Sequence, residues 1–288
     1  MSKTKQKDLF DKFYTKYDIA DSCIKELLKF VKEGALFIEP SAGNGVFKEA
    51  LVSNGIEDSL VCCYDIKPDK EWIKQQDFLL LTEEDLQSNG MDLVFIGNPP
   101  FGIRNKTTDA FINQCIKLNA ETIAFILPSV YDKFARQKVF PQDYSLVSNL
   151  ELPKNSFLFE GLDYNIPSVF QIWKKTKKYK NLRKKEFTSC KDFEILKSKE
   201  KHKADFFVFG AAPYNTLDVD EVDKNNRGYY LKSFVDKEEL KSRIKAVDWK
   251  KYGKSSANGG VFWLTKSEVY EVYQLAHETR LFMSGMQA

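Results

Sequence analysis

Apolar residues in the first part of the chain follow two spacings, one helical and one extended. Between residues 19 and 31 they recur every three or four positions, which predicts a helix. Short continuous apolar runs follow and are typical of buried strands; they lie at residues 36–39, 60–64, 91–97, 122–128 and 168–173. Further helices are predicted at 46–53 and 108–118. This alternation predicts an α/β fold, a mostly parallel Rossmann-like sheet with helices on both faces.

The pattern changes near residue 175. From Lys174 to Ala204 the chain has thirteen Lys or Arg residues and four Asp or Glu residues. Such a run is either a solvated linker or a surface that faces phosphates, and both interpretations stay open. Beyond it, aromatic-rich strands at 206–215 and 227–234 and helices at 236–245 and 266–276 predict a small α+β region. We therefore expect two domains, residues 1–175 and a basic C-terminal region at 176–288.

Composition bounds the class of protein. With 43% hydrophobic residues the chain can build a core, so we expect a globular protein rather than a disordered one. The chain has no apolar run long enough to span a membrane, and its start, "MSKTKQKDLFDK", is polar. We expect a soluble intracellular protein, in the cytoplasm or with the nucleoid or nucleus, and no membrane partner. Five cysteines and two histidines lack the spacing of a disulfide framework or a zinc site, so no metal is expected.

Candidate ligand-binding residues follow the ends of the predicted strands, where open α/β sheets bind ligands. The run "FIEPSAGNG" at 37–45 contains glycines that allow close backbone approach. Asp65 follows the next strand at a distance suited to binding both ribose hydroxyls. Asp77 could accept from an adenine amine and Phe78 could cover the adenine ring, while Glu39 could hold an ammonium group. A full G-x-G-x-x-G is absent, so S-adenosylmethionine fits better than a dinucleotide.

The sequence "GNPPFG" at 97–102 ends another strand with an acceptor-rich loop. Pro99 and Pro100 have a fixed φ and no N–H, so the main chain there is rigid and offers only carbonyls. The Asn98 side chain adds a second acceptor beside the Pro99 carbonyl, and Phe101 adds an aromatic face. Two acceptors can hold both hydrogens of an exocyclic amine and free its lone pair to attack a methyl sulfonium. That chemistry depends on positioning and needs no shifted acid or base.

Taken together, "EPSAGNG", "YDIKPD", "QQDF" and "GNPPFG" resemble the motifs of S-adenosylmethionine-dependent N6-adenine DNA methyltransferases. Their order is similar to that of the gamma class, and "FYT" at 13–15 resembles the segment that closes over the methionine part of the cofactor. The resemblance covers roughly residues 11–174 and implies a class I methyltransferase fold with target recognition in the C-terminal region. It implies these cofactor-binding residues: Tyr14, Thr15, Glu39, Pro40, Ser41, Gly43, Gly45, Asp65, Ile66, Asp77, Phe78 and Asn98.

The same resemblance implies Asn98, Pro99, Pro100 and Phe101 as catalytic residues. In the family the target base is flipped out of its stack and held against aromatic rings. Phe101 would be the first of these rings. The run "NSFLFEGLDYNIPS" at 155–168 holds the second, for which we choose Phe159, with Phe157 and Tyr164 as alternatives.

The motif identifies a planar amine rather than the molecule that carries it. We expect transfer to adenine N6 in DNA, because the glycine turn resembles the DNA-modifying branch and the basic run favours a nucleic acid. RNA adenine N6-methylation is the first alternative, and methylation of protein glutamine is the second. A non-catalytic nucleic-acid-binding module is the third, although such a module has no need of two acceptors beside a sulfonium.

Overall fold

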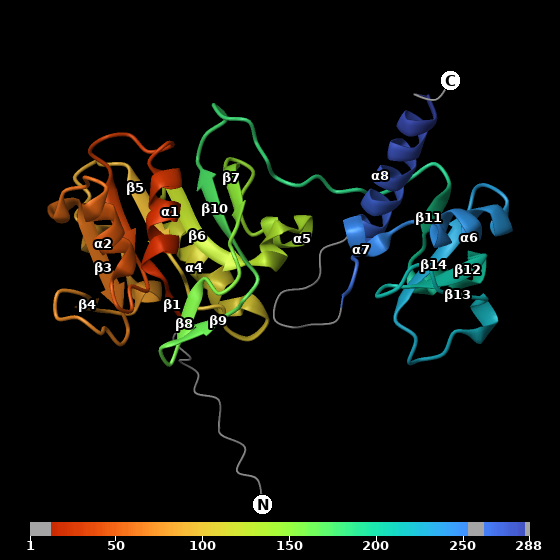
Figure 1. Ribbon diagram of the computed structural model, residues 1–288, viewed down its shortest axis with the longest axis horizontal. Coiled ribbons are helices and arrows are strands. Elements are labelled where there is room, and N and C mark those ends of the chain that lie inside the picture. The colour runs from red at the N-terminus through yellow and green to blue at the C-terminus, as the bar shows by residue number, and fades with distance from the viewer. Residues whose placement is uncertain (1–12, 253–261, 286–288) are drawn as a thin grey trace, which may run out of the picture. The chain divides into compact units, whose positions relative to one another are not determined.

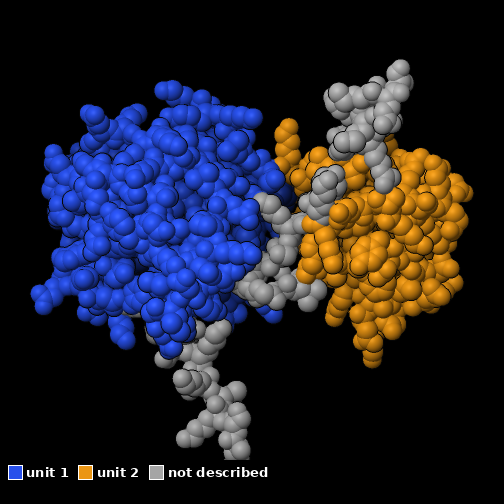
Figure 2. All heavy atoms as spheres, viewed as in Figure 1, with its two compact units in different colours: residues 1–184 blue, residues 185–288 orange. Residues whose placement is uncertain are grey.

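The fold is described from a computed structural model, in which residues 13–252 and 262–285 are described. The polar stretch at residues 1–12 lies outside them. The chain divides into two compact units, residues 1–184 and 185–288 (Figure 2). Within the described part of the chain, no helix has both the length and the apolar character needed to cross a membrane.

Unit 1 is built on a seven-stranded sheet with the order β4-β3-β2-β5-β6-β10-β7 (Figure 1). Its strands are β2 Leu36–Glu39, β3 Val61–Asp65, β4 Lys74–Gln75, β5 Leu93–Gly97, β6 Thr122–Pro128, β7 Ser145–Glu151 and β10 Ser168–Lys174. The strands from β4 to β6 pair in parallel, whereas β10 is antiparallel to both β6 and β7. The strand order reverses between β2 and β5. This arrangement confirms the predicted Rossmann-like α/β class, and it adds β4 and β7, which the apolar pattern did not reveal.

Helices cover both faces of this sheet. On one face α1 and α2 pack against strand residues such as Phe37 and Val94, and on the other α4 packs against Ile38 and Phe95. Adjacent strand residues face opposite sides, so strands with both faces buried must be apolar throughout. The helices of unit 1 are α1 Tyr17–Leu27, α2 Val46–Ser53, α3 Glu83–Leu86, α4 Lys106–Lys117 and α5 Phe134–Gln137.

A second, three-stranded sheet in unit 1 joins two segments that lie far apart in the sequence. It consists of β1 Tyr14–Thr15, β8 Phe157–Phe159 and β9 Leu162–Tyr164, in the order β1-β8-β9. β8 and β9 form a hairpin whose two-residue turn, Glu160 and Gly161, has φ of +50° and +77°. Such turns match the twist of paired strands. The sheet therefore places the N-terminal segment beside a hairpin far along the chain.

Unit 2 is a four-stranded antiparallel sheet with helices on one face, which agrees with the predicted α+β region (Figure 1). Its elements are β11 Phe193–Ile195, β12 Phe206–Phe209, β13 Thr216–Leu217, β14 Gly228–Ser233, α6 Lys237–Lys245, α7 Trp249–Tyr252 and α8 Lys266–Gly285. Phe206, Val208 and Leu231 project from one face of the sheet into a core completed by α6 and α8.

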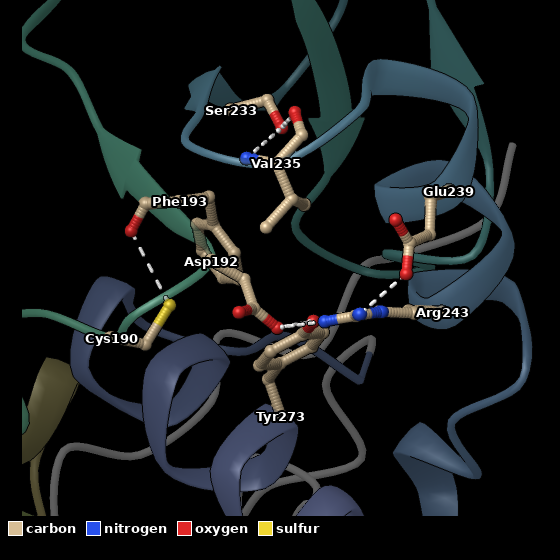
Figure 3. A network of polar contacts seen from close by, with 8 residues as sticks. All are labelled: Cys190, Asp192, Phe193, Ser233, Val235, Glu239, Arg243 and Tyr273. Atoms are coloured by element: carbon tan, nitrogen blue, oxygen red, sulfur yellow. Dashed lines mark hydrogen bonds and ion pairs between the residues drawn. The ribbon is translucent and has the colours of Figure 1, made fainter.

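A polar network ties the helices of unit 2 to the segment before β11 (Figure 3). The Asp192 carboxylate accepts hydrogen bonds from Arg243 at 2.8 Å and from the Tyr273 hydroxyl at 2.5 Å. Arg243 also pairs with Glu239, one turn earlier on α6. Burial raises the pKa of the Asp192 carboxyl, but the hydrogen bonds from Tyr273 and Arg243 outweigh it, and the net shift is downward. Asp192 is thus an anion shared by α6 and α8.

The first unit extends past the predicted boundary at residue 175, to Lys184. The cause is Arg183, whose guanidinium donates four hydrogen bonds of 2.7–3.0 Å to main-chain carbonyls between Gln137 and Tyr144. It also lies over the Trp173 ring, 4.7 Å from the centroid. Arg183 is half-buried, and Lys174 is buried and donates to the Phe30 carbonyl. Part of the basic run therefore stabilises unit 1 and does not face solvent.

We predict that Arg183→Ala lowers the free energy of unfolding by about 2–4 kcal/mol, because four carbonyls lose a charged donor. Urea denaturation followed by circular dichroism measures this. Lys180→Ala, an exposed cation in the same segment, is the control and should change little. Equal effects of the two substitutions would contradict the structural role of Arg183.

Candidate active site

The turn after β2 brings the main chain into a tight bend before α2. Gly43 and Gly45 have φ of +53° and +83°, in the left-handed region that favours glycine. A Cβ on Gly45 would lie 2.1 Å from the Trp72 ring, so no side chain fits there. The Ala42 N–H donates to the Tyr64 carbonyl at the end of β3. The predicted turn is thus held against the neighbouring strand.

Glu39 ends β2 and is only 1% exposed. Its carboxylate accepts the Lys48 N–H at 3.3 Å, in the first turn of α2, and the Cys63 thiol at 3.5 Å. Burial raises the pKa of Glu39 to about 8, more than these hydrogen bonds lower it. The Glu39 side chain is thus directed at the N-terminus of α2, and its predicted contact with an ammonium group stays a prediction. We assign Glu39 to positioning the glycine turn.

Asp65 at the end of β3 connects the two loops on this side of the sheet. One carboxylate oxygen accepts the Gly43 N–H and the other accepts the Lys67 N–H, both at 2.7 Å. Each oxygen keeps a lone pair for a further donor. Ile66 follows with 53% of its surface exposed, an apolar side chain beside a polar anchor. Asp65 and Ile66 therefore present the chemistry that a ribose and a base edge require.

Tyr14 on β1 lies against the glycine turn. A Cβ on Gly43 would be 3.3 Å from the Tyr14 ring, and the Tyr14 hydroxyl donates to Asp69 at 2.6 Å. Burial, followed by the hydrogen bond to Asp69, raises the pKa of Tyr14 well above its ordinary value. The neighbouring Thr15 is buried and its hydroxyl has no hydrogen-bond partner among the described residues. The predicted "FYT" segment thus meets the predicted cofactor turn.

The third strand end contains Asp77 and Phe78. Asp77 accepts the Leu79 N–H at 2.9 Å and caps a short 3₁₀ turn. Phe78 is 2% exposed, and its ring packs in the core against Phe95 and Phe111. The Phe78 ring therefore belongs to the core of unit 1, and its predicted role as a cover for an adenine ring stays a prediction. An apolar residue in a loop near a strand end fits both a core position and a position against a ligand. The sequence could not separate these two interpretations.

The loop after β5 is connected to both predicted cofactor segments. The Asn98 main-chain carbonyl accepts the Ser41 hydroxyl at 3.3 Å, and Pro40 lies beside Gly97. The Asn98 side-chain N–H donates to the Phe13 carbonyl at 3.3 Å. Asn98 Oδ1 is buried and has no hydrogen-bond partner among the described residues. One amide group is thus anchored through its nitrogen, and its oxygen is left as an unused acceptor.

The remainder of this loop is fixed from α4. The Thr108 hydroxyl lies within hydrogen-bond distance of the carbonyls of Pro100 and Phe101, at 3.1 and 3.3 Å. Gly102 has a φ of +64°, and a Cβ there would collide with Thr107. Within the described residues the Pro99 carbonyl accepts no hydrogen bond. The loop therefore holds two unused acceptors, Asn98 Oδ1 and the Pro99 carbonyl, on a rigid frame.

An aromatic cluster lies where β1 meets the β8–β9 hairpin. The Phe13 ring contacts Tyr164 and Phe159, with centroids 4.9 and 5.1 Å apart. Phe157 is fully buried in the sheet core, which removes it as a base-stacking residue. Among the described residues there is no ring contact between Phe101 and Phe159, so the structure does not pair the two predicted rings. Phe159 and Tyr164 remain, joined by Phe13.

Sequence reasoning gave no role to Phe13, the first residue of "FYT", and missed Trp72. Phe13 contributes both a carbonyl to Asn98 and a ring to the aromatic cluster. Trp72 covers Gly45 and is 43% exposed, and Lys48 lies 4.8 Å from its ring centroid. A tryptophan in the otherwise polar run "KPDKEWIKQQD" was the available signal for the second of them. No group of three or more potential metal ligands occurs in the part of the chain that the structure describes.

The residues present at this site fit S-adenosylmethionine. Asp65 supplies a buried carboxylate whose oxygens keep acceptor capacity, beside the glycine turn. The unused Asn98 oxygen on the adjoining loop gives the site a polar atom that protein groups do not satisfy.

Comparison with protein families identifies the fold that carries this geometry. The model of the EDM2 methyltransferase-like domain matches residues 44–187, half of the chain. The chain belongs to the EDM2 methyltransferase-like domain family. The matched segment contains Asp65, the Asn98 loop and the β8–β9 hairpin, and it begins within the glycine turn. Membership of the EDM2 methyltransferase-like domain family agrees with the predicted cofactor, S-adenosylmethionine.

Solved structures show related folds at low identity. A candidate RNA methyltransferase from Pyrococcus horikoshii is 16% identical, with a TM-score of 0.42, over 60% of this chain and 92% of the other. The modification subunit of a candidate type I restriction enzyme from Vibrio vulnificus YJ016 is 12% identical, with a TM-score of 0.44, over 91% of this chain and 60% of the other. At these identities the matches concern the fold alone. A search of curated proteins found no match.

We predict that pH changes stability through Glu39. Its pKa rises from an ordinary value of 4.5 to about 8 in the folded chain, so the folded state holds a proton that the unfolded state releases. The resulting stabilisation is complete below the unfolded pKa and is lost as the pH rises through the folded one. Between about pH 5 and about pH 8, the melting temperature of the wild type should fall more steeply than that of Glu39→Gln, and above this range the two curves should run parallel.

The matched control is Glu49→Gln, which removes an exposed carboxylate in the first turn of α2. It should follow the wild type across this pH range. Parallel curves for the wild type and Glu39→Gln would show that Glu39 is ionised in the folded chain.

Proposed function

We propose that the chain transfers a methyl group from S-adenosylmethionine to the exocyclic N6 amine of adenine in DNA. The observation that carries the proposal is the pair of unused acceptors, Asn98 Oδ1 and the Pro99 carbonyl, on one rigid loop. An amine bound by both would place one hydrogen on each acceptor. Its lone pair would then point away from the ring plane, toward the segment that carries the glycine turn.

The proposed chemistry depends on position and dipoles. S-adenosylmethionine would supply a methyl group on a positively charged sulfur. The amine nitrogen would bond to the methyl carbon as the carbon–sulfur bond breaks, leaving S-adenosylhomocysteine, and the methylated amine would then lose one proton to solvent. A hydrogen bond to Asn98 Oδ1 would hold one amine hydrogen out of the ring plane. The orientation of the Asn98 amide is fixed by its hydrogen bond to the Phe13 carbonyl. The contact between Ser41 and Asn98 couples the cofactor turn to this loop. Such preorganisation lowers the barrier without a general base of shifted pKa.

The same residues explain how the cofactor would be held. Gly43 and Gly45 would face its methionine part, with Tyr14 and Thr15 closing from β1. Asp65 would bind the ribose hydroxyls and Ile66 would contact the adenine, with Asp77 near the adenine amine. The Tyr14 ring already lies against Gly43, so closure of β1 and binding at the turn are parts of one arrangement.

A flipped base needs aromatic surface beside the amine site. Phe101 is half-buried on the catalytic loop, and Phe159 and Tyr164 lie on the β8–β9 hairpin. Tyr164 is 42% exposed, which favours it over Phe159 as the ring that is open to a base. Because Phe13 contacts both rings and also binds Asn98, the hairpin and the catalytic loop are held in one cluster.

DNA is preferred as the substrate because of the motif resemblance, and the exposed cations after β10 support a nucleic acid. RNA adenine is the alternative that these features also suit. A protein glutamine would present the same amide geometry but would gain nothing from the cations. Incubation with each class of polymer in turn separates these substrates.

Tritiated S-adenosylmethionine, incubated separately with duplex DNA, single-stranded DNA, RNA and a protein extract, should label DNA at N6-methyladenine. Nucleoside analysis of the digested product identifies the modified base. Label confined to RNA or to protein would replace the DNA proposal with that alternative. Label in none of the four would leave a nucleic-acid-binding module.

We predict that Asn98→Ala reduces methyl transfer at least a hundredfold, because one of two amine acceptors is removed. Binding of S-adenosylmethionine, measured by calorimetry, should change little. Asn113→Ala, on the exposed face of α4, is the matched control and should keep full activity. Near-normal transfer by Asn98→Ala would mean that the acceptor pair does not bind the reacting amine.

A further inference from the structure

Unit 2 contains a cavity of about 450 Å³ at one end of its sheet, and no motif of the catalytic unit accounts for it. Its volume is within the range of pockets for small ligands. Three aromatic and three basic side chains dominate its lining: Phe207, Tyr230, Trp263, Lys201, Lys224 and Arg227. That combination is characteristic of sites that hold both a flat ring and an anion.

The aromatic side of the cavity belongs to the uncovered face of the sheet. Phe207 on β12 and Tyr230 on β14 are directly opposite in register, and their ring centroids are 5.2 Å apart. They point away from the helices, because their neighbours Val208 and Leu231 fill the helix-covered core. Phe207 is buried and Tyr230 is half-buried. Phe207 thus forms a floor, and Tyr230 offers part of its ring to the cavity.

Glycines let neighbouring groups pack closely at this end of the sheet. A Cβ on Gly228 would lie 1.9 Å from the Val208 carbonyl, and one on Gly210 would lie 2.5 Å from the Trp263 ring. The Leu264 N–H donates to the Gly210 carbonyl at 2.9 Å and holds the segment of Trp263 against β12. Trp263 is therefore positioned by the backbone and not only by its own side-chain contacts.

The cations at the cavity differ from three cations of α6. Lys237, Lys241 and Arg243 each pair with a carboxylate. Within the described residues, Lys201, Lys224 and Arg227 form no ion pair. Three cations without carboxylate partners around one cavity leave it with unbalanced positive charge.

The acidic residue in the lining does not cancel this charge by pairing. Asp223 accepts the N–H groups of Asn225 and Asn226, at 2.7 and 3.1 Å, and so caps the turn before β14. Lys224 and Arg227 project from that same turn. The hydrogen bonds of Asp223 stabilise this turn, and the turn positions the two cations.

We propose that this cavity binds an unpaired nucleotide of the nucleic-acid substrate. The base lies against Tyr230 and Trp263, and Lys201, Lys224 and Arg227 contact the phosphates on either side. Stacking on sheet-face aromatics flanked by cations is how many proteins hold single strands, whereas a paired base would keep its faces inside the duplex. The proposal rests on the proposed function only for the identity of the polymer, since the pocket itself requires any exposed base with a phosphate.

The test measures binding to the full chain without a methyl donor. The probe is a fluorescein-labelled single-stranded DNA of twelve nucleotides, followed by anisotropy at several salt concentrations. Tyr230→Leu should weaken binding about tenfold because the base no longer stacks on the ring. The double variant Lys224→Gln with Arg227→Gln should reduce the salt slope by about 0.7 for each phosphate that is no longer neutralised.

Two matched controls lie in the same unit. Phe234→Leu changes an exposed aromatic residue beyond the other end of β14, and Lys245→Gln changes an exposed cation near the end of α6. Both should bind the oligonucleotide like the wild type. Melting curves of all variants establish that each is folded, so that weaker binding is assigned to the cavity.

Unchanged affinity and salt slope in the cavity variants would overturn the proposal. So would displacement of the oligonucleotide by polyglutamate at equal charge concentration, which would indicate a general anion surface. Binding that depends on Tyr230, in a chain that methylates none of the four substrates, would support this site and count against the proposed methyl transfer. Methyl transfer to DNA, with no effect of the cavity variants on binding, would support the proposed methyl transfer and count against this site.

Discussion

Parallel pairing of β2 with β5 is the constraint on which the candidate active site depends. The two strands are far apart in the sequence but adjacent in the sheet, and the strand order reverses between them. The glycine turn and the "NPPF" loop follow the carboxyl ends of these strands and therefore lie side by side. The short reach of the Ser41 hydroxyl to the Asn98 carbonyl is a consequence of that adjacency. A methyl donor on one loop and an amine on the other need little further organisation.

The N-terminal strand adds the part that the main sheet cannot supply. β1 pairs with β8, so residues from opposite ends of unit 1 form one small sheet. From that sheet, Phe13 reaches Asn98 through its carbonyl and Tyr164 through its ring, while Tyr14 lies on Gly43. The glycine turn, the "NPPF" loop and the aromatic hairpin are thus connected through two consecutive residues. Disruption of the β1–β8 pairing would disturb all three at once.

Much of unit 1 could be predicted because its strands are buried on both faces, which leaves continuous apolar runs. The strand Thr122–Pro128 and the helix Val46–Ser53 have the predicted bounds. The short strands β4 and β9 carry exposed residues and left no such pattern. The burial of Phe78 could not be predicted, because burial of an aromatic ring depends on what packs above it. The basic run could not be divided from sequence, since only the fold shows that Arg183 satisfies carbonyls and that neighbouring lysines face solvent.

The Asn98 amide also limits which bases the loop could accept. A rotation that exchanged its oxygen and nitrogen would break the hydrogen bond to the Phe13 carbonyl and set two oxygens against each other. The oxygen is therefore held in place before any base arrives. A ring carbonyl in the position of the amine would face two hydrogen-bond acceptors and no hydrogen-bond donor. The loop would then repel guanine, thymine and uracil at that position, and its selectivity would come from electrostatic exclusion as much as from attraction.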